Sequence, residues 1–375
     1  MLLSFFCFGI AVNIRAEEES TIVPSAQELR LLELINEARR SPLDIAVSLG
    51  MDREQILRDL PEMNSILING MEPLKLNEDL GITAAAHNND MFARNYYSSA
   101  SPEGICFEDR ISGKSDQRVL LTGESLGMVS FKNFMNPDDA VSVIFENMLR
   151  DELNPQRVEK RNILNPDLQE IGISFKSGKL NFGDEKRNIY LIVCDFAIFL
   201  YPEKVEQLLY DAVNEVRSNS DNSVVYNAPL AINDCLTDAA KGHMADMRGN
   251  IFFSHNSLDG KTALDRVYDY GYKSVYLNEV IGAFIFDGFM DPMKGARILL
   301  DRMISDNIEK NVGRWGIFDP SLTDMGIAFD AIFIKTGEGM FMGIYLMVCD
   351  FGYEHSVFSG GSVRQDLSDF CIFAE

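Results

Sequence analysis

Apolar residues recur at helical spacing along residues 25–42. The apolar positions on one face are Leu31, Leu34, Ile35 and Ala38. Ser25 and Glu28 have the spacing of a capping box, in which each side chain accepts a backbone hydrogen bond from the other residue. Pro42 stands where the pattern stops. The sequence therefore predicts a helix that begins after Ser25 and ends near Pro42.

Two further predicted helices carry an apolar stripe that includes a histidine. Asn77 can cap the first of them. The stripes are Leu80, Ala84, His87 and Met91 in one helix and Leu236, Ala240, His243 and Met247 in the other. We therefore expect both histidines on the inward faces of their helices. Residues 43–72 predict a helical insertion with a break at Pro61, and residues 137–153 and 293–305 predict amphipathic helices.

Apolar runs and alternating patterns predict strands late in each half of the chain. Residues 171–175 and 189–196 flank a glycine-containing turn, which predicts a β-hairpin. Residues 325–334 and 340–351 repeat this pattern, with a turn at 337–339. Each half thus has helices first and an antiparallel pair last, which predicts an α+β fold.

The two halves form an internal repeat. Residues 73–110 recur at 229–266, and Pro, His, Met, Gly and Arg keep one offset of 156 positions throughout, as from Pro73 to Pro229. Glu124 corresponds to Glu279, and residues 193–197 correspond to 348–352. A period near 155 residues is too long for a solenoid unit and suits a whole domain.

These correspondences predict the domain organisation. We assign one domain to residues 26–200 and a second to residues 203–353, joined by a short linker at Tyr201-Pro202-Glu203. Residues 354–375 form a tail that contains Gly360-Gly361 and is compatible with a last strand on the second domain.

Composition supports two packed domains and excludes some partners. The length of 375 residues and the hydrophobic fraction of 46% suit two ordinary cores. The net charge is −23, from 57 acidic and 34 basic residues. Nucleic acid and anionic membrane surfaces are therefore poor partners.

The N-terminus predicts secretion. Residues 2–12 are apolar, a run too short to span a bilayer but suited to a signal peptide, with cleavage after Ala16. The Lys or Arg that usually precedes such a run is absent. We assign residues 1–25 to a signal peptide and leader, and expect a secreted, periplasmic or extracellular protein. No later stretch of the sequence has the pattern of a transmembrane helix.

The cysteines do not predict a disulfide framework. Cys7 would leave with the signal peptide, and the remaining five cannot all pair. Cys194 and Cys349 hold equivalent places in apolar strands, so we expect buried thiols there. The sequence has no CxxC spacing, phosphate-binding glycine loop, Gly-x-Ser-x-Gly elbow or His-Glu-x-x-His motif. Four histidines leave a Ser-His-Asp triad open, but no residue pattern points to one.

Short motifs occur in one order in both halves. The first half contains NEAR, HNNDM, SPEG, DR, GES, RNILNP and EIGI, and the second contains NEVR, HMADM, FFSH, SLDG, DR, NEV, IFDP and DMGI. Together they resemble the CAP superfamily (cysteine-rich secretory proteins, antigen 5, pathogenesis-related 1), whose domains are also called SCP-like, with more similarity to the bacterial secreted type. The resemblance implies two tandem α-β-α sandwich domains with small antiparallel sheets.

The resemblance also implies a cleft with two histidines and one or two glutamates, where some family members bind zinc. The first half keeps Glu124 but has Ser99 in place of one family histidine and Glu159 in place of the other. The second half keeps His255 and Glu279 but has Gly313 at the second histidine position. Both clefts are therefore degenerate, and neither half holds the histidine pair.

This loss bears on metal binding and catalysis. Zinc in proteins takes about four ligands, three of them from the protein in open sites. The second half offers His255, Glu279 and His243, and the first offers only His87 and carboxylates. Histidine is also the usual general base at neutral pH. We therefore predict no bound metal, no cofactor and no catalytic residue.

Each candidate residue also has a structural interpretation. For His87 and His243 we favour a hydrogen-bonded core histidine over a binding role. For His255 and Glu279 the two interpretations are equally supported. We expect Glu124 to tie its loop to the sheet through charged hydrogen bonds to backbone N–H groups. Solvated side chains are sufficient to explain Glu146, Glu159 and Asp301.

The candidate ligand-binding cleft is formed by His255, Glu279, His243, Ser99, Glu124 and His87. We expect His255 and Glu279 within direct or one-water hydrogen-bonding distance on a partly exposed cleft wall, with Ser99 and Glu124 in the matching places. The chain would turn at Gly249-Asn250 and bury Phe252 and Phe253 against the sheet. His255→Ala should then weaken binding with little loss of stability, whereas His243→Ala should destabilise the fold.

The resemblance leads to one main functional hypothesis. It predicts a secreted, non-catalytic protein that binds a small apolar or lipid-like ligand, or a cell-wall or protein partner of the cell envelope. The alternative is a metal-assisted hydrolase or protease in the second domain that uses His255 and Glu279. In a third possibility the first domain only supports the second.

Overall fold

The computed structural model describes residues 23–112, 118–157, 161–218, 228–309, 316–337, 340–354 and 364–373. The chain divides into two compact units. The first unit contains the chain up to Lys114 together with Gly123–Leu164 and Gln169–Phe196. The second unit contains Ala197–Glu375 and two short segments, Ser115–Thr122 and Asn165–Leu168.

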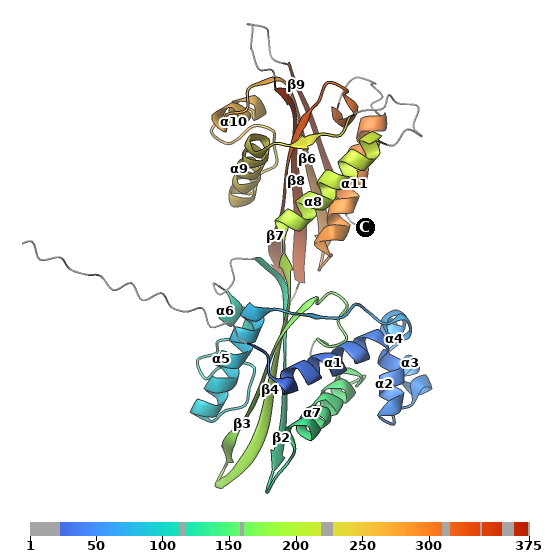
Figure 1. Cartoon of the computed structure of the whole chain (residues 1–375), viewed down its shortest axis with the longest axis vertical. Coiled ribbons are helices and arrows are strands. Elements are labelled where there is room, and N and C mark those ends of the chain that lie inside the picture. Colours follow the sequence, from blue (N-terminus) through green and yellow to red (C-terminus); the bar gives the residue numbers. More distant parts are fainter. Residues whose placement is uncertain are drawn as a thin grey trace, which may run out of the picture. The chain divides into compact units, whose positions relative to one another are not determined.

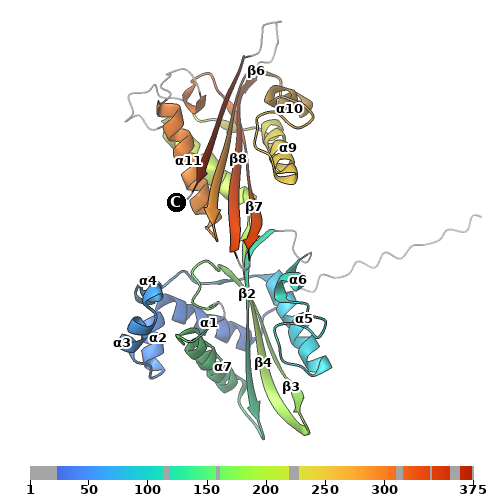
Figure 2. The ribbon, with the colours of Figure 1, turned by 180° about the vertical axis from the view of Figure 1, so that it is seen from behind.

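Helices cover both faces of a four-stranded sheet in the first unit (Figure 1). The sheet order is β1-β3-β4-β2. In Figures 1 and 2, α5 and α6 lie on one side of the strands and α1 and α7 on the other. The elements are α1 (Ala26–Arg40), α2 (Pro42–Ser48), α3 (Arg53–Asp59), η1 (Pro61–Met63), α4 (Asn64–Asn69), β1 (Lys75–Leu76), α5 (Glu78–Arg94), α6 (Phe107–Ile111), β2 (Arg118–Phe131), α7 (Pro137–Glu152), β3 (Glu170–Phe182) and β4 (Glu185–Leu200).

The second unit repeats this arrangement and adds a strand. The sheet order is β5-β7-β8-β6-β9, with α9 and α10 on one side and α8 and α11 on the other (Figure 1). The elements are α8 (Pro202–Ser218), β5 (Ala231–Ile232), α9 (Asp234–Asn250), α10 (Ala263–Asp269), β6 (Ser274–Asp287), α11 (Pro292–Glu309), η2 (Gly316–Phe318), β7 (Asp324–Gly337), β8 (Met340–Glu354) and β9 (Arg364–Phe373). The two units are therefore similar α-β-α layers, as the α+β prediction required.

The predicted hairpins are confirmed. β3 and β4 are neighbours joined by a two-residue turn at Gly183-Asp184, which makes them antiparallel. β7 and β8 pair antiparallel, with Ile327 opposite Cys349. The short strands β1 and β5 pair in parallel with β3 and β7, so both sheets are mixed rather than purely antiparallel. Of the turn expected at 337–339, Gly337 ends β7 and residues 338–339 lie outside the described residues.

Local sequence explains how the first helix of each unit begins and docks. Ser25 and Glu28 form the predicted capping box, with Ser25 N donating to Glu28 Oε2 at 2.7 Å. Asn36 holds the Leu74 backbone with two hydrogen bonds of 3.0 and 2.7 Å. Asn214 holds Leu230 in the same way, at 3.1 and 2.8 Å. The NEAR and NEVR motifs therefore fix one helix against the strand that follows in each unit.

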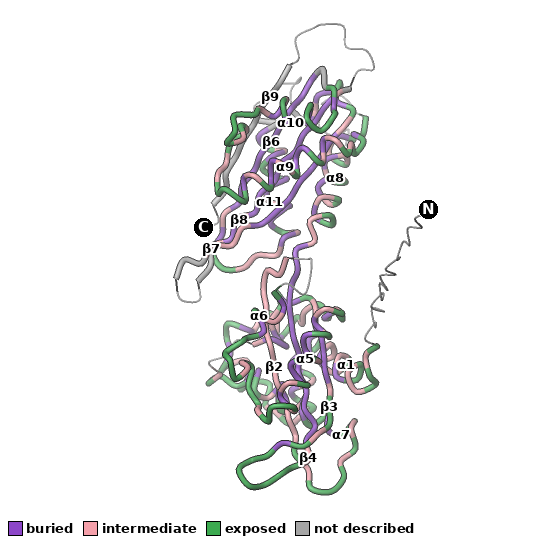
Figure 3. Tube along the Cα trace, turned by 90° about the vertical axis from the view of Figure 1, so that its left-hand side faces the viewer, coloured by how far each residue is buried: buried purple, intermediate pink, exposed green. Residues whose placement is uncertain are grey.

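The core of the second unit has two layers, one on each face of its sheet. Tyr276, Val280 and Phe284 of β6 belong to the cluster that packs under α8 and α11. Ile281 and Ala283 belong to the cluster on the α9 side, against which Phe252 and Phe253 pack as expected. In Figure 3 the buried colour follows most of β4 in the first unit and of β6 and β8 in the second, whereas β2 is mainly of intermediate burial. No helix in the described part of the chain is long and apolar enough to cross a membrane.

Three predictions about local structure were wrong. The turn expected at Gly249-Asn250 is not formed, because α9 continues through both residues. Ile251 caps the helix in the left-handed backbone conformation. Asn95 closes α5 in the same conformation. Pro202 begins α8, so only Tyr201 separates β4 from that helix. Glu124 lies in the long strand β2, where the sequence analysis placed a loop, and Glu279 lies in the equivalent strand β6.

Candidate functional site

Five elements of the second unit bring ionisable side chains to one place on the α9 face of its sheet. α9 contributes His243, the following segment His255, α10 Arg266, β6 Glu279 and β8 Asp350. Glu279 and Asp350 face each other in antiparallel register. All except His255 have at most 6% of their surface exposed, and the His255 side chain is 14% exposed. The site is therefore a buried polar cluster within an apolar sheet.

Glu279 is held by two cationic or proton-donating groups. His255 Nδ1 lies 2.6 Å from Glu279 Oε1, and Arg266 binds Oε2. Arg266 also donates to the His255 carbonyl at 2.8 Å, which fixes the segment that carries the histidine. Since a carboxylate only accepts, His255 donates from Nδ1. Its Nε2 meets no hydrogen-bond partner in the described part of the chain.

Burial favours the protonated form of the second carboxyl of the cluster, that of Asp350. Burial, followed by the nearby charge of Glu279, raises the pKa of Asp350 well above its usual value. Burial alone would also raise the pKa of Glu279, but the hydrogen bond from His255 and the charge of Arg266 hold it below its usual value. A neutral Asp350 therefore donates to an ionised Glu279, and two carboxyls can share a space that would not tolerate two charges.

The first unit has an equivalent cluster with two differences, a serine in place of a histidine and an added threonine donor. His87, Arg110, Glu124 and Asp195 take the places of His243, Arg266, Glu279 and Asp350, and Ser99 takes the place of His255. Each of these pairs comes from corresponding elements of the two units. Thr83 donates to Asp195 at 2.9 Å.

The change from histidine to serine alters the electrostatics of the first cluster. Burial raises the pKa of Glu124, although Arg110 and hydrogen bonds from Asp195 and Ser99 oppose the shift. Burial and the Glu124 charge raise the pKa of Asp195 well above its usual value. Without an imidazole donor, both carboxyls of the first unit are therefore pushed toward their neutral forms, whereas in the second unit only Asp350 is.

The two helix histidines are core residues, as predicted. His87 Nε2 lies 3.0 Å from the Ser98 carbonyl and His243 Nε2 lies 2.8 Å from the Ser254 carbonyl. Both are at most 2% exposed. Burial, with the charge of Arg110, lowers the pKa of His87 to about 4, so the ring is neutral and donates from Nε2. Each histidine fastens the segment that follows its helix.

The predicted contact between His255 and Glu279 is confirmed as a direct hydrogen bond, but the predicted exposure is wrong for Glu279. That side chain has no exposed surface, because Arg266, His255 and Asp350 enclose it. The role predicted for Glu124 is also wrong, since its partners are the side chains of Arg110, Asp195 and Ser99.

Another glutamate has the role that was predicted for Glu124. Glu152, at the end of α7, accepts from the backbone N–H groups of Asn162 at 2.7 Å, Ile163 at 3.1 Å and Leu164 at 3.2 Å. Glu146 is partly exposed and pairs with Arg150, which fits a solvated helix face.

Sequence reasoning missed the two aspartates and the two arginines of the clusters. A signal for the aspartates was present, because Asp195 and Asp350 interrupt otherwise apolar strands at equivalent places in both repeats. A charge retained twice inside a buried strand indicates a partner across the sheet. The Asp-Arg pairs at 109–110 and 265–266 were recognised only as short motifs shared by the two halves.

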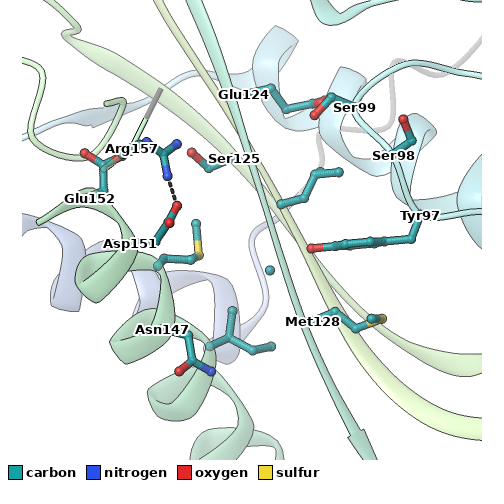
Figure 4. A pocket seen from close by; sticks show the side chains of 14 residues that line it. Tyr97, Ser98, Ser99, Glu124, Ser125, Met128, Asn147, Asp151, Glu152 and Arg157 are labelled. Carbon is teal, nitrogen blue, oxygen red and sulfur yellow. Dashed lines mark ion pairs between the residues drawn. The ribbon is translucent and has the colours of Figure 1, made fainter. Parts of the chain in front are cut away.

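A pocket of about 430 Å³ lies beside the first cluster (Figure 4). Its walls come from the segment after α5, from β2 and from α7. In Figure 4 the labelled side chains lie on both sides of β2, with Glu124 and Ser99 together at one end and the Arg157–Asp151 ion pair at another. The lining residues are Tyr97, Ser98, Ser99, Glu124, Ser125, Leu126, Gly127, Met128, Ile144, Asn147, Met148, Asp151, Glu152 and Arg157.

The clusters do not fit a zinc ion. Zinc needs lone pairs that converge on one point, but the oxygens of Glu279 are bound by His255 and Arg266, and His255 directs its N–H at that carboxylate. Within the described residues, no three His, Cys, Asp or Glu side chains form a group that could hold a metal ion. Glu159 and Gly313, at the family's second histidine position, lie outside the described residues.

Comparison with known proteins finds a similarity in the first unit. Residues 32–196 match the model of the family described as "CAP: Cysteine-rich secretory protein family". The match covers the first repeat. No curated protein matches the chain.

Two solved structures are similar to parts of this chain. One is an outer surface protein from Borrelia burgdorferi, with 17% identity over 42% of this chain and 97% of that chain, and a TM-score of 0.27. The other is an extracellular protein containing an SCP domain from Bacillus anthracis str. Ames, with 16% identity over 45% of this chain and 59% of that chain, and a TM-score of 0.26.

Proposed function

We propose that this chain is an extracellular, non-catalytic binding protein whose ligand site is the pocket beside β2 in the first unit. The observation that carries the proposal is a cavity of about 430 Å³ at the cleft of the CAP domain, a size typical of small-molecule sites. The signal-peptide pattern of residues 2–16 supports an extracellular location. The repeat supports a second domain of the same family.

The pocket lining favours an amphipathic ligand. Leu126, Met128, Ile144 and Met148 supply apolar surface for the body of such a ligand. Hydroxyl and amide groups of Ser99, Ser125 and Asn147 can bind its polar end. A small lipid-like molecule with a polar head, or an exposed part of a cell-envelope partner, has this chemistry.

The acidic side chains that line this pocket are engaged by other groups, which argues against general-base catalysis there. Asp151 pairs with Arg157, and Glu152 accepts from three backbone N–H groups. Glu124 is the carboxyl that the pocket shares with the buried cluster, and Arg110, Asp195 and Ser99 all bind it. The imidazole beside it, His87, is buried and has a pKa of about 4. General-base catalysis needs an accessible acceptor with a pKa near the working pH, and neither group meets that requirement.

A binding titration tests the pocket. Asn147 lines it from α7, so Asn147→Trp should fill it, whereas Val143 lies one turn away on an exposed part of the same helix and gives the control Val143→Trp. We expect the wild type and Val143→Trp to bind the fluorescent amphiphile dansylaminoundecanoic acid, and Asn147→Trp to bind about tenfold more weakly or worse. Equal binding by all three proteins, with folding verified by circular dichroism, would contradict the proposal.

One observation favours hydrolysis in the second unit as a second candidate. His255 directs Nδ1 at Glu279, and its other ring nitrogen, Nε2, is a buried atom without a hydrogen-bond partner among the described residues; a neutral ring would keep there the lone pair that a general base needs. Turnover of p-nitrophenyl acetate or a casein substrate by the wild type, with about hundredfold loss or more in His255→Gln, would support it. No turnover above the His255→Gln background would exclude it for these substrates.

A further inference from the structure

The two equivalent strands β2 and β6 differ in what lies along their outer edges. In the described part of the first unit, β2 is the last strand of its sheet and has β4 as its neighbour. In the second unit, β6 lies between β8 and β9, and β9 pairs with it in parallel. The outer edge of β6 in the second unit is therefore paired with another strand, whereas β2, its equivalent in the first unit, is an edge strand.

The pocket of the first unit stands where β9 lies in the second. Glu124 and Glu279 each pair with the equivalent arginine, and the alignment that matches them also matches Gly127 with Gly282. Residues 279–283 of β6 pair with residues 367–371 of β9. The matching residues of β2 are 124–128, and these are the five consecutive residues that line the pocket.

Five consecutive lining residues place the pocket at the strand's edge. Side chains of a strand point alternately to its two faces, so a cavity on one face would be lined by every second residue. Here Glu124, Leu126 and Met128 alternate with Ser125 and Gly127, and all of them line the pocket. Gly127 lies against Ile144 and Met148 of α7, which shows that the pocket reaches the α7 face as well.

We propose that the outer edge of β2 binds an extended segment of a partner polypeptide as an added strand, parallel to β2 and between α7 and the segment 97–99. This deepens the proposed binding function and rests on it. A row of unpaired backbone groups is a template for strand addition, in which main-chain hydrogen bonds supply the affinity and side-chain pockets the specificity. The five pocket-lining residues of β2, 124–128, span about 17 Å of strand.

The side chain of Asn162 sets the position on the β2 edge at which the added strand can begin to pair. Its side-chain amide donates to the Glu124 carbonyl at 2.8 Å and to Ser125 Oγ at 3.0 Å, so a side chain already satisfies the edge at that point. The corresponding residue of the second repeat is Gly316, by the alignment that matches Pro166 with Pro320. Where β9 covers the edge, no side chain is needed, and the partner strand should pair beyond Asn162, from about Ser125 onward.

The occupant is a separate polypeptide without net negative charge. If β9 of this chain or of a second copy moved to β2, the edge of β6 would lose its paired strand. Such an exchange would therefore give no net gain in strand pairing. The chain carries a net charge of −23, which disfavours an acidic partner. A neutral or basic extended segment, such as a chain terminus or loop of an envelope protein, fits both conditions.

The test uses the full chain and a synthetic peptide. The probe has the sequence of residues 364–373, whose backbone pairs with the equivalent edge, with Asp366→Asn, Asp369→Asn and Cys371→Ser to remove negative charge and the thiol. Two further versions carry N-methyl groups on alternate amides, one on the odd and one on the even positions. Binding is followed by fluorescence anisotropy and by hydrogen exchange of residues 124–131.

Strand addition has a specific signature in this set. Only alternate amides of an added strand face its neighbour. One methylated peptide should therefore bind like the parent, and the other should lose about tenfold or more. Hydrogen exchange should slow within 124–131, and Asn147→Trp should abolish the effect while Val143→Trp keeps it. Equal binding of both methylated peptides, or no protection of 124–131 at saturation, would overturn the inference.

Two other outcomes separate this inference from the proposed function. If the peptide fails while dansylaminoundecanoic acid still binds in an Asn147-dependent way, strand addition is wrong and the pocket remains a small-molecule site. If neither binds, both proposals fall. If the chain is a dimer with residues 124–131 already protected, a second copy is the occupant and a separate partner is excluded.

Discussion

Ser99 stands in the first unit where the second unit has His255. This difference changes which carboxyl of the buried cluster is ionised. In the second unit, His255 stabilises an ionised Glu279 and leaves the proton on Asp350. In the first unit, Ser99 gives a weaker donor, and the pKa of Glu124 rises instead. The carboxyl pairs are retained in both repeats, so they belong to the architecture of the sheet and not to one domain's ligand.

Asp350→Asn should change how the second unit's stability depends on pH. Burial raises the folded pKa of Asp350 above its unfolded value of about 3.9, so the folded state binds one more proton between these values. Wild-type stability is therefore lost as pH rises above about 3.9, by up to about 1.4 kcal/mol per pH unit. The neutral amide keeps a donor for Glu279 and has no such slope.

Urea unfolding from pH 4 to 8 measures this difference. The chain's single tryptophan, Trp315, belongs to the second repeat and supplies the fluorescence signal. The free energy of unfolding of Asp350→Asn, relative to the wild type, should increase with pH. The matched variant Asp195→Asn, in the first unit, should leave this signal unchanged. A relative stability that is flat in pH would show that Asp350 is ionised in the fold.

His255→Ser should give the second unit the cluster of the first. The sequence analysis expected little stability loss at this position, but Glu279 is fully buried and loses its closest donor. A hydrogen bond to a charged group contributes about 1.5–3 kcal/mol, which is the expected loss at pH 7. Because the pKa of Glu279 is lowered in the fold, this contribution is present above its unfolded pKa and is lost as pH falls below about 4.3.

The same tryptophan fluorescence at pH 7 and pH 4 follows this variant. Ser99→His, which makes the reverse change in the first unit, is the control that should leave the second unit's unfolding unchanged. If His255→Ser lost equal stability at both pH values, the contribution of His255 would be packing and not its hydrogen bond to Glu279. His243→Ala remains expected to destabilise, since it leaves the Ser254 carbonyl without its donor.

At the scale of elements, most helices and both hairpins were predictable because their signals are local. Ser25 with Glu28, and Asn77 at the start of α5, act through neighbours in sequence. β2 was not predictable, because Gly123 and Gly127 interrupt its pattern. These glycines are required by tertiary packing: a Cβ at Gly123 would overlap Asn162, and one at Gly127 would overlap Ile144 of α7.

The site was predictable only in part for the same reason. The pairing of His255 with Glu279 followed from the resemblance to a known family, and the inward position of His243 followed from helical periodicity. The partners of Glu124 come from α6 and β4, at distances along the chain that no local pattern reports. The pocket depends on β2 being an edge strand, which is a property of the whole sheet.

Removing β9 should expose the β6 edge and destabilise the second unit. In a chain that ends at residue 363, the ten-residue pairing between β6 and β9 is lost. We expect a melting temperature lower by several degrees and self-association through the open edge, because unpaired edge strands template pairing between chains. Light scattering after size-exclusion chromatography and a thermal melt measure both effects.

A chain that ends at residue 373 is the control, because it removes only the two residues beyond β9. It should behave like the full chain in both measurements. Unchanged melting and a monomeric state after the longer truncation would show that β9 contributes little to the second sheet. In that case the pairing of β9 with β6 would not support the inference that the β2 edge binds an added strand.

At the scale of the whole molecule, the two units share one scaffold and differ at the positions where the resemblance to the family leads one to expect histidines. The first unit has Ser99 where the second has His255, and the second repeat has Gly313 at the other histidine position. Both units retain the arginine, glutamate and aspartate of the buried cluster.

The full chain should therefore hold no stoichiometric zinc at neutral pH. Arg266 places a positive charge against Glu279, and that charge opposes a divalent cation at the same carboxylate. In the first unit, Arg110 does the same at Glu124, and Ser99 is a poor zinc ligand. After dialysis at pH 7, mass spectrometric metal analysis should find far less than one zinc per chain, both for the wild type and for His255→Ala. About one zinc per chain in the wild type, lost in His255→Ala, would mean that His255 turns from Glu279 to the metal, and the hydrolase alternative would then be favoured.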